Sequence, residues 1–276
     1  MTLSRSVLCI GVVMLLGLGV GAWFLVRPSS TGPAQHVLFI GNSYTAVNSL
    51  PTLFQHIATS AGYTTPIVDS STPGGETLAG HLKDTNTLKL IDSGAPDGRP
   101  WDVVVLQEQS ETTAVAAVSP YVDQLFVSGV RGLYQRIKAH DPKAVVVLYE
   151  TWSRDPALFA AGKVDTSFDG ASAQEMQQRI RQSYQNAATS AAGAGNLPLP
   201  IAPVGDMWEQ DARSSTPVPL YSSDGSHPNS AGSYLAGLVI FSTIYQTSVA
   251  KVTFAGEVPA AQANMLRALV DAQLSK

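Results

Sequence analysis

Three side chains, from two distant stretches of the chain, have the types needed for acyl transfer. Ser43 follows a Gly-Asn pair directly behind a short apolar run, and Asp224 stands three residues before His227 in the stretch Asp-Gly-Ser-His-Pro. A serine attacks a carbonyl carbon once a histidine takes its proton, and a carboxylate holds the histidine ring in the right tautomer. The sequence therefore offers a nucleophile, a base and an orienting carboxylate for one site.

Each of these stretches also has a purely structural interpretation. Gly41 and Asn42 tolerate unusual backbone angles, and Asn or Ser commonly caps a helix. The Asp-Gly pair before His227 is typical of a turn near a helix start. A metal site is disfavoured there, because no further ligands lie nearby in the sequence and Cys9 is the only cysteine. The catalytic interpretation depends on a fold that brings the stretches together.

Two further polar stretches follow apolar runs. The loop Gly74-Gly75-Glu76-Thr77 comes after the run that begins at Pro66, and Gln107-Glu108-Gln109 comes directly after 103–106. A Gly-Gly pair is common in turns, and a glutamine at a strand end often only satisfies backbone groups. Taken singly, neither stretch indicates a function.

Strand-like and helix-like segments alternate along the chain. The predicted strands are the apolar runs at 36–40, 66–69, 103–106, 144–149 and 199–204. The predicted helices, with apolar residues at helical spacing, cover 50–61, 120–137, 174–192, 230–246 and 259–274. This pattern predicts an α/β fold of three layers, with a parallel sheet covered by helices on both faces. Such sheets place ligand sites at the carboxyl ends of their strands, where the serine, the glycine pair and the glutamines all stand.

In their order and spacing, the stretches resemble the sequence blocks of the SGNH/GDSL hydrolases, a superfamily of serine esterases and lipases. Gly-Asn-Ser resembles the first block, Gly-Asp-Ser, with Asn42 in place of the usual Asp. Pro-Gly-Gly-Glu-Thr resembles the second block and places its glycine at Gly75, while Asp-Gly-Ser-His matches the last block. The similarity covers most of residues 36–247. It implies a three-layer α/β/α fold of the flavodoxin-like, SGNH hydrolase type.

The resemblance also implies a role for each site residue. Ser43 is the nucleophile, His227 the base that returns the proton to the leaving alcohol, and Asp224 the residue that orients the ring. The implied oxyanion hole consists of the backbone N–H groups of Ser43 and Gly75 and the side-chain amide of Gln107, with Gln109 as the alternative. No metal and no cofactor is implied.

The third block departs from the pattern of the family. Where the family usually has Gly-x-Asn-Asp, this chain has Leu-Gln-Glu-Gln-Ser, which resembles the Gln-containing block of sialate O-acetylesterase-like enzymes. Gln107 and Gln109 point to one face if the strand continues through them, because the side-chain period of a strand is two. The third oxyanion donor is therefore open between them.

Length and composition favour one large globular domain. The chain has 276 residues, of which 45% are hydrophobic and 14% charged, so it can bury a sizeable core. A net charge of -4 and a sequence pI near 5.7 argue against a nucleic-acid partner, because no basic cluster could follow a phosphate backbone. The predicted hydrolase domain covers residues 36–276.

The N-terminal residues have a different character. Residues 7–26 carry no charge, and Arg5 and Arg27 flank them, so 1–27 is predicted to be an uncleaved signal anchor that spans a membrane. Residues 28–35, rich in Pro, Gly and Ser, form a predicted linker. The charge balance favours a catalytic body outside the cytoplasm, periplasmic or extracellular, or secreted if the segment is cleaved.

The substrate is the least determined part of the prediction. An envelope location and the Gln-type third block favour a serine esterase that removes O-acetyl or other short acyl groups from a carbohydrate or glycan. A lipase or an acyltransferase would use the same triad, and a catalytically silent glycan-binding module is the alternative from another class. Reactivity of Ser43 discriminates between enzyme and binding module.

Aromatic residues and one long segment are further candidates for substrate contact. Tyr44, Trp152, Trp208 and Tyr221 are predicted either to form a rim on which sugars stack or simply to pack in the core. The segment 151–171, which includes Arg154, follows the fourth predicted strand. We expect it to lie over the cleft, either selecting the substrate or only covering the site.

Overall fold

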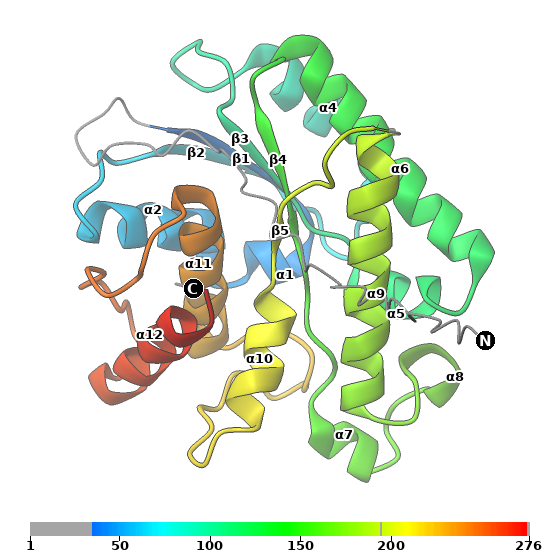
Figure 1. Cartoon of the computed structure of the whole chain (residues 1–276), viewed down its shortest axis with the longest axis vertical. Coiled ribbons are helices and arrows are strands. Elements are labelled where there is room, and N and C mark those ends of the chain that lie inside the picture. Colours follow the sequence, from blue (N-terminus) through cyan, green and yellow to red (C-terminus); the bar gives the residue numbers. More distant parts are fainter. Residues whose placement is uncertain (1–34, 194, 275–276) are drawn as a thin grey trace, which may run out of the picture.

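A parallel sheet of five strands forms the centre of the molecule in the computed structural model, which describes residues 35–193 and 195–274 (Figure 1). The strands are β1 (His36–Ile40), β2 (Ile67–Ser71), β3 (Val103–Leu106), β4 (Val145–Tyr149) and β5 (Ile201–Ala202). Their order across the sheet is β2-β1-β3-β4-β5, and every neighbouring pair is parallel. This is the flavodoxin-like order, in which the chain reverses direction across the sheet beside β1.

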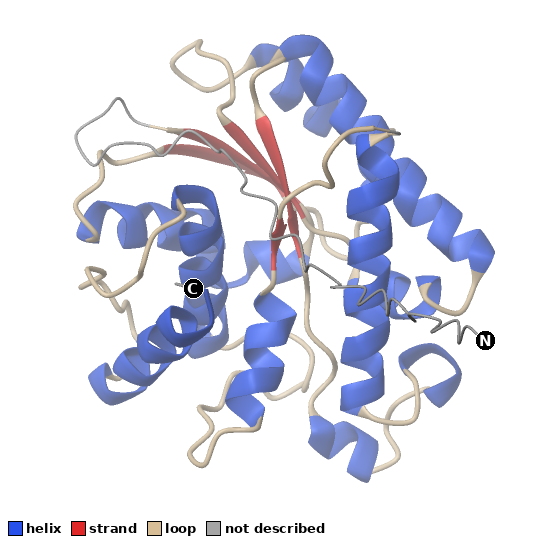
Figure 2. Cartoon of the chain, viewed as in Figure 1, coloured by secondary structure: helices blue, strands red, loops and turns tan. Residues whose placement is uncertain are grey.

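Helices cover both faces of this sheet (Figure 2). The longer ones are α2 (Leu50–Ser60), α4 (Thr85–Ser93), α6 (Pro120–His140), α9 (Ala173–Ala192), α10 (Val204–Ala212), α11 (Ser230–Tyr245) and α12 (Ala260–Leu274). The shorter ones are α1 (Ser43–Ala46), η1 (Val47–Ser49), α3 (Leu78–His81), α5 (Ser110–Ala116), α7 (Pro156–Ala160) and α8 (Thr166–Asp169). The predicted three-layer α/β/α fold is therefore confirmed.

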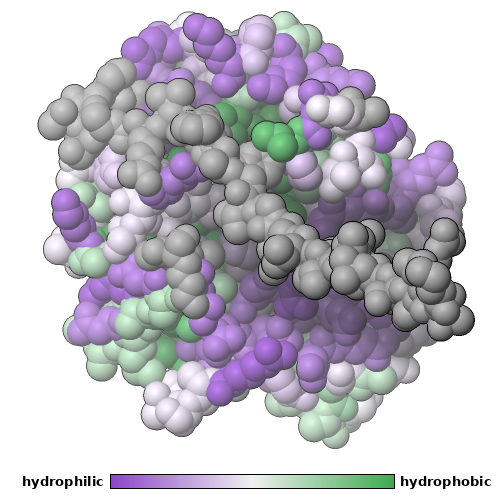
Figure 3. Space-filling view, in the orientation of Figure 1, coloured by the Kyte–Doolittle hydropathy of each residue, from purple (hydrophilic) through white to green (hydrophobic). Residues whose placement is uncertain are grey.

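Alternate residues of each strand enter two separate hydrophobic cores. In β1, Val37 and Phe39 pack into the core shared with α2, α10, α11 and α12, whereas Leu38 and Ile40 pack into the core shared with α5, α6 and α9. Strands β1, β3, β4 and β5 consist almost wholly of apolar residues because both faces of a parallel sheet are buried, whereas the edge strand β2 is mostly half-buried and includes Asp69, Ser70 and Ser71. The surface in Figure 3 is mainly hydrophilic, with small hydrophobic areas, as expected when the large apolar side chains are inside.

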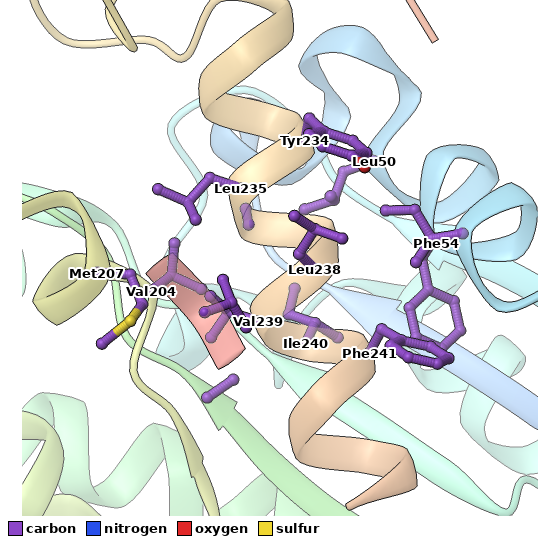
Figure 4. Close-up of a cluster of buried hydrophobic side chains, with 14 of the residues drawn as sticks. Leu50, Phe54, Val204, Met207, Tyr234, Leu235, Leu238, Val239, Ile240 and Phe241 are labelled. Carbon is purple, nitrogen blue, oxygen red and sulfur yellow. The ribbon is translucent and has the colours of Figure 1, made fainter. Parts of the chain in front are cut away.

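Helix α11 is buried along nearly its whole length. Leu235, Leu238 and Ile240 are fully buried, and the helix lies between α2 and α10 (Figure 4). In the close-up, Leu50 and Phe54 of α2 stand on one side of α11 and Val204 and Met207 of α10 on the other. A helix that is apolar all round must be buried in this way. Its N-terminus is consequently fixed, and the loop that precedes it carries His227.

Most of the predicted elements agree with the structure, and the last strand differs most. The run at 199–204 forms only a two-residue strand, Ile201–Ala202, and Val204 already begins α10. Proline explains the difference, because Pro200 and Pro203 have no N–H to donate to a neighbouring strand. Helices α4 and α10 and the short helices were not predicted from the sequence.

The predicted signal anchor at 1–27, with Cys9, and nearly all of the predicted linker at 28–35 lie outside the described residues. Within 35–193 and 195–274, no helix combines the length and the apolar composition needed to cross a bilayer.

Candidate active site

Ser43 is the first residue of α1, immediately beyond the carboxyl end of β1. Gly41 continues the sheet by donating its N–H to the Ser71 carbonyl, and Asn42 then caps the helix by accepting the N–H of Tyr44. The first N–H groups of a helix have no partner within it, so the N–H of Ser43 remains available to a ligand. The turn between sheet and helix thus presents a hydroxyl and an N–H at the same point.

The loop before α11 carries Asp224 and His227. One carboxylate oxygen of Asp224 accepts the backbone N–H groups of Ser226 and His227, each at 2.9 Å. The other lies 2.6 Å from Nδ1 of the His227 ring. Gly225 has a φ of +67°, which allows the tight turn that brings the carboxylate back onto the ring. Asp224 therefore holds His227 through two contacts, one to its backbone N–H and one to its ring.

The structure brings this loop against Ser43. Nε2 of His227 lies 2.9 Å from Oγ of Ser43, so a continuous chain of hydrogen bonds runs from Asp224 through His227 to Ser43. Burial raises the pKa of the Asp224 carboxyl, but the N–H groups of Ser226 and His227 and the histidine ring outweigh it and hold that pKa below its usual value. An ionised Asp224 can stabilise the charge that His227 acquires when it takes a proton.

The loop Gly74-Gly75-Glu76-Thr77, which resembles the second block, lies beside the turn that carries Ser43. Gly75 has a φ of +72°, in the left-handed region, and its N–H donates to no protein group in the described part of the chain. Asn42 donates a side-chain N–H to the Glu76 carbonyl at 3.0 Å, which ties the glycine loop to the turn that carries Ser43. Two backbone N–H groups, at positions 43 and 75, are thus available near the Ser43 hydroxyl.

Comparison with known proteins agrees with this arrangement. No protein-family model and no curated protein sequence matches the chain. Among solved structures, a protein from Slackia heliotrinireducens that is named as an SGNH hydrolase is 30% identical in sequence to the chain. The match covers 77% of this chain and 100% of that protein, with a TM-score of 0.56. The chain belongs to the SGNH hydrolases. It is an enzyme of the type that acts on ester bonds.

A second structure supports the fold alone. A DUF4886 family protein from Bacteroides uniformis has a TM-score of 0.65 at 18% sequence identity, over 86% of this chain and 93% of its own. The predicted membership of the SGNH/GDSL superfamily and the predicted hydrolase activity are confirmed by the 30% identical Slackia heliotrinireducens protein.

Gln107, the first candidate for the third oxyanion donor in this SGNH hydrolase, is fully buried and points to Asn42. Its Nε2 donates to Oδ1 of Asn42 at 3.0 Å and to the Glu108 carbonyl at 2.6 Å. Its Oε1 accepts the N–H of Asn42 at 3.0 Å and the hydroxyl of Thr45 at 2.8 Å. An amide has two N–H hydrogens, and here both have partners within the protein.

Gln109, the alternative candidate, is in a different situation. It is half-buried and caps α5, because its Oε1 accepts the N–H of Thr112 at 2.8 Å. Its Nε2 has no hydrogen-bond partner among the residues that the structure describes. Strand β3 ends at Leu106, so the expectation that both glutamines share one strand face does not apply beyond that residue.

Glu108 lies between the two glutamines and is fully buried. One oxygen accepts the N–H of Leu78 at 3.1 Å and the other the N–H of Gln109 at 2.7 Å. Burial raises the pKa of this carboxyl to about 8, against the opposing effect of the two hydrogen bonds. The side chain thereby joins the start of α3, which follows the loop that contains Gly75, to the end of β3.

The candidate aromatic rim is mostly core. Tyr44, Trp152 and Trp208 are buried and stack face to face in that order, with ring centroids 4.6 and 4.0 Å apart. Tyr44, at one end of the stack, also packs against His227, because the centroids of the two rings lie 5.3 Å apart and the rings meet at a steep angle. Packing, one of the two predicted alternatives, is thus what these rings do. Tyr221 is half-buried and donates its hydroxyl to the Ser153 carbonyl.

The segment 151–171 also reaches the site. Trp152 donates its ring N–H to the Ser226 carbonyl, and the Arg154 guanidinium contacts the hydroxyls of Tyr44 and Ser226. These contacts were not predicted, although Tyr44 and Ser226 are the immediate neighbours of Ser43 and His227. Within the described ranges, no group of three or more His, Cys, Asp or Glu side chains is arranged to hold a metal ion.

Proposed function

We propose that the protein is a serine esterase that removes short acyl groups, O-acetyl above all, through an acyl-enzyme on Ser43. The observation that carries the proposal is the chain of hydrogen bonds from Asp224 to His227 to Ser43, at 2.6 and 2.9 Å. This geometry allows His227 to take the serine proton as the hydroxyl attacks.

The reaction has two steps in this proposal. Oγ of Ser43 attacks the ester carbonyl, His227 takes its proton, and the alcohol leaves with that proton while the acyl group stays on Ser43. Water then attacks the acyl-enzyme with His227 again as the base, which releases the carboxylic acid and restores the serine. Asp224 stays ionised throughout and balances the charge on the ring.

The developing negative charge needs donors in both steps. The N–H groups of Ser43 and Gly75 are available for this role, and one such donor typically contributes about 3–4 kcal/mol to the transition state. For the third donor we favour the amide of Gln109 over that of Gln107. The reason is that both N–H hydrogens of Gln107 already bind Asn42 and Glu108, whereas Nε2 of Gln109 has no partner among the described residues.

The surroundings of the triad favour a polar alcohol over a long acyl chain. The side chains that contact one another beside Tyr44 and His227 are Arg154, Ser110, Glu111 and Ser226, all polar. A carbohydrate or glycan hydroxyl suits such surroundings, so an O-acetylated sugar is the proposed substrate class. The lipase alternative would need an apolar channel for the acyl chain beside Ser43.

The location remains part of the proposal. The uncharged stretch 7–26 between Arg5 and Arg27 supports a membrane anchor with the esterase domain outside the cytoplasm. A glycan substrate in the cell envelope would be accessible from that side.

The test is hydrolysis of p-nitrophenyl acetate, butyrate and octanoate by the purified full-length protein in the presence of EDTA. We expect a burst of nitrophenol equal to the enzyme concentration, with acetate turned over fastest. Ser43→Ala and His227→Ala should abolish the burst, and Asp224→Asn should lower kcat by roughly 10³–10⁴-fold. Ser223→Ala, an exposed serine of the same loop, is the control. A parent no faster than Ser43→Ala would leave the binding module as the better hypothesis.

A further inference from the structure

Arg154 is a buried cation beside the two catalytic segments. Its side chain is only 11% exposed, although it lies in a loop between β4 and α7. Burial of a guanidinium is costly unless hydrogen bonds and an ion pair replace its water. The position therefore needs an explanation from the groups around it.

Those groups come from three parts of the chain. Nη1 donates to the Tyr44 hydroxyl at 2.6 Å, to the Ser226 hydroxyl, and more weakly to the Ser110 hydroxyl at 3.2 Å. Nη2 pairs with the Glu111 carboxylate at 2.6 Å. The hydroxyls of Tyr44 and Ser226 also share a hydrogen bond of 2.7 Å, so the guanidinium closes a ring of three groups.

Two of these partners adjoin the triad. Tyr44 follows Ser43 in α1, and its ring packs against the edge of the His227 ring. Ser226 precedes His227, and its N–H binds the carboxylate of Asp224. The segments of Ser43 and His227 are far apart in sequence, and the short contact between Nε2 and Oγ depends on how they are placed relative to each other.

We propose that Arg154 is a positioning residue, which holds the segment of Ser43 against the segment of His227 and so sets the distance between nucleophile and base. This inference rests on the proposed triad. The guanidinium suits the task because its planar fork presents several donors in fixed directions, which a lysine ammonium does not. Glu111 holds the other side of the fork, and Asp169, buried nearby, adds negative charge to the surroundings of the cation.

A different role would be a tether that only fastens the covering segment 151–171 to the body. The two roles differ in what the loss of Arg154 changes. A tether affects stability, or the Michaelis constant if the segment selects the substrate. A positioning residue affects the reactivity of Ser43 itself, because a displacement of about 1 Å can cost 10²-fold in rate.

The test compares Arg154→Ala and Arg154→Lys with Tyr44→Phe, which removes the hydroxyl but keeps the ring stack. Arg179→Ala is the matched control, since that arginine is 19% exposed and pairs with Glu175 without touching the catalytic segments. For each protein, kcat, KM, the melting temperature and the rate at which a fluorophosphonate probe labels Ser43 are measured. The labelling rate reports on nucleophile activation without any ester substrate.

We expect Arg154→Ala and Arg154→Lys to lower kcat and the labelling rate by about 10- to 100-fold, with KM changed less than about threefold. Millimolar guanidinium should restore part of the activity of Arg154→Ala. It should leave the activity of the control, Arg179→Ala, unchanged. Tyr44→Phe should lower kcat by a smaller factor. In the double variant Tyr44→Phe, Arg154→Lys, the factor by which kcat falls should be smaller than the product of the two single factors, because both changes act through one contact.

Labelling and kcat within twofold of the parent in Arg154→Lys would overturn the proposal, whatever happens to the melting temperature. If Arg154→Ala does not fold, Arg154→Lys and Tyr44→Phe decide in the same way. A parent that neither turns over esters nor labels at Ser43 refutes the proposed function, and the positioning role with it. A parent that depends on Ser43 while the arginine variants keep full activity refutes the positioning role alone.

Discussion

Asn42 and Gln107 bind each other through two reciprocal hydrogen bonds. The backbone N–H of Asn42 donates to Oε1 of Gln107, and Nε2 of Gln107 donates to Oδ1 of Asn42, both at 3.0 Å. The end of β3 is thereby fixed to the turn that carries Ser43. In this chain an asparagine occupies the place of the usual aspartate of the family, and it has a glutamine amide as its partner.

Replacement of Gln107 by Ala should mainly destabilise the fold. The change leaves the N–H of Asn42 and the Thr45 hydroxyl without their partner in a buried place, and each such group costs about 1–3 kcal/mol. It also removes one of the two N–H groups that Oδ1 of Asn42 accepts. We expect the free energy of unfolding to fall by about 3 kcal/mol or more, measured by urea denaturation. A loss below about 1 kcal/mol would contradict the structural role of this glutamine.

Replacement of Gln109 by Glu should impair catalysis with little effect on stability. A glutamate keeps the oxygen that caps α5 at Thr112 but removes the N–H donor. We expect kcat to fall by about 10²-fold or more, the loss typical of one oxyanion donor, while the melting temperature changes little. If Gln109→Glu retains the parental kcat, Gln109 is not the third donor.

The two glycines of the second block should respond differently to alanine. A Cβ atom at either Gly74 or Gly75 meets no atom within 4 Å, so crowding is the same for both. Only Gly75 has a positive φ, +72°, where a side chain strains the backbone by about 1 kcal/mol. We expect Gly75→Ala to lower kcat about tenfold by shifting its N–H, and Gly74→Ala to stay near the parent. Equal effects in a steady-state assay would show that backbone conformation does not matter here.

Glu108 should make the protein less stable as the pH rises. The ordinary value of 4.5 applies to the unfolded chain, whereas burial raises the pKa in the native state to about 8. Between these values the native state holds a proton that the unfolded state has released. The contribution of this group is therefore complete below about pH 4.5 and is lost as the pH rises toward 8, by up to about 1.4 kcal/mol per pH unit.

Urea denaturation between pH 5 and 8 checks this dependence. Glu108→Gln cannot ionise, so the difference in unfolding free energy between the parent and this variant should shift in favour of the variant as the pH rises. A difference that is constant over this range, or that shifts in favour of the parent, would show that Glu108 is ionised in the native protein at neutral pH.

The sheet and the grouping of Ser43, Asp224 and His227 were predictable from local patterns. Residues 37–40, 103–106 and 145–149 are unbroken apolar runs, and the five predicted helices have apolar residues at helical spacing, so these elements could be read from short windows. Ser43, Asp224 and His227 stand in stretches whose residue types already suit one reaction. Helices of four to seven residues, such as α1 and α5, are too short to show a period.

The amide proposed for the oxyanion hole and the role proposed for Arg154 could not be predicted in this way. The choice between Gln107 and Gln109 depends on where β3 ends and on which of the two glutamines binds Asn42. The alternation of side chains along a strand predicts neither of these. Arg154 lies 110 residues from Tyr44 and 72 from Ser226 along the chain. Contacts across such separations leave no pattern in a single sequence.

The brevity of β5 also affects how molecules of this protein meet in solution. The outer edge of a sheet can pair with a strand of another molecule and so start aggregation. Here that edge consists of the two residues Ile201–Ala202, which stand between Pro200 and Pro203. Because a proline has no N–H, a foreign strand finds too few donors for a continuous ladder. The same residues that stop the sheet from growing within the chain thus disfavour strand-to-strand association at the β5 edge of the sheet, the opposite edge being β2.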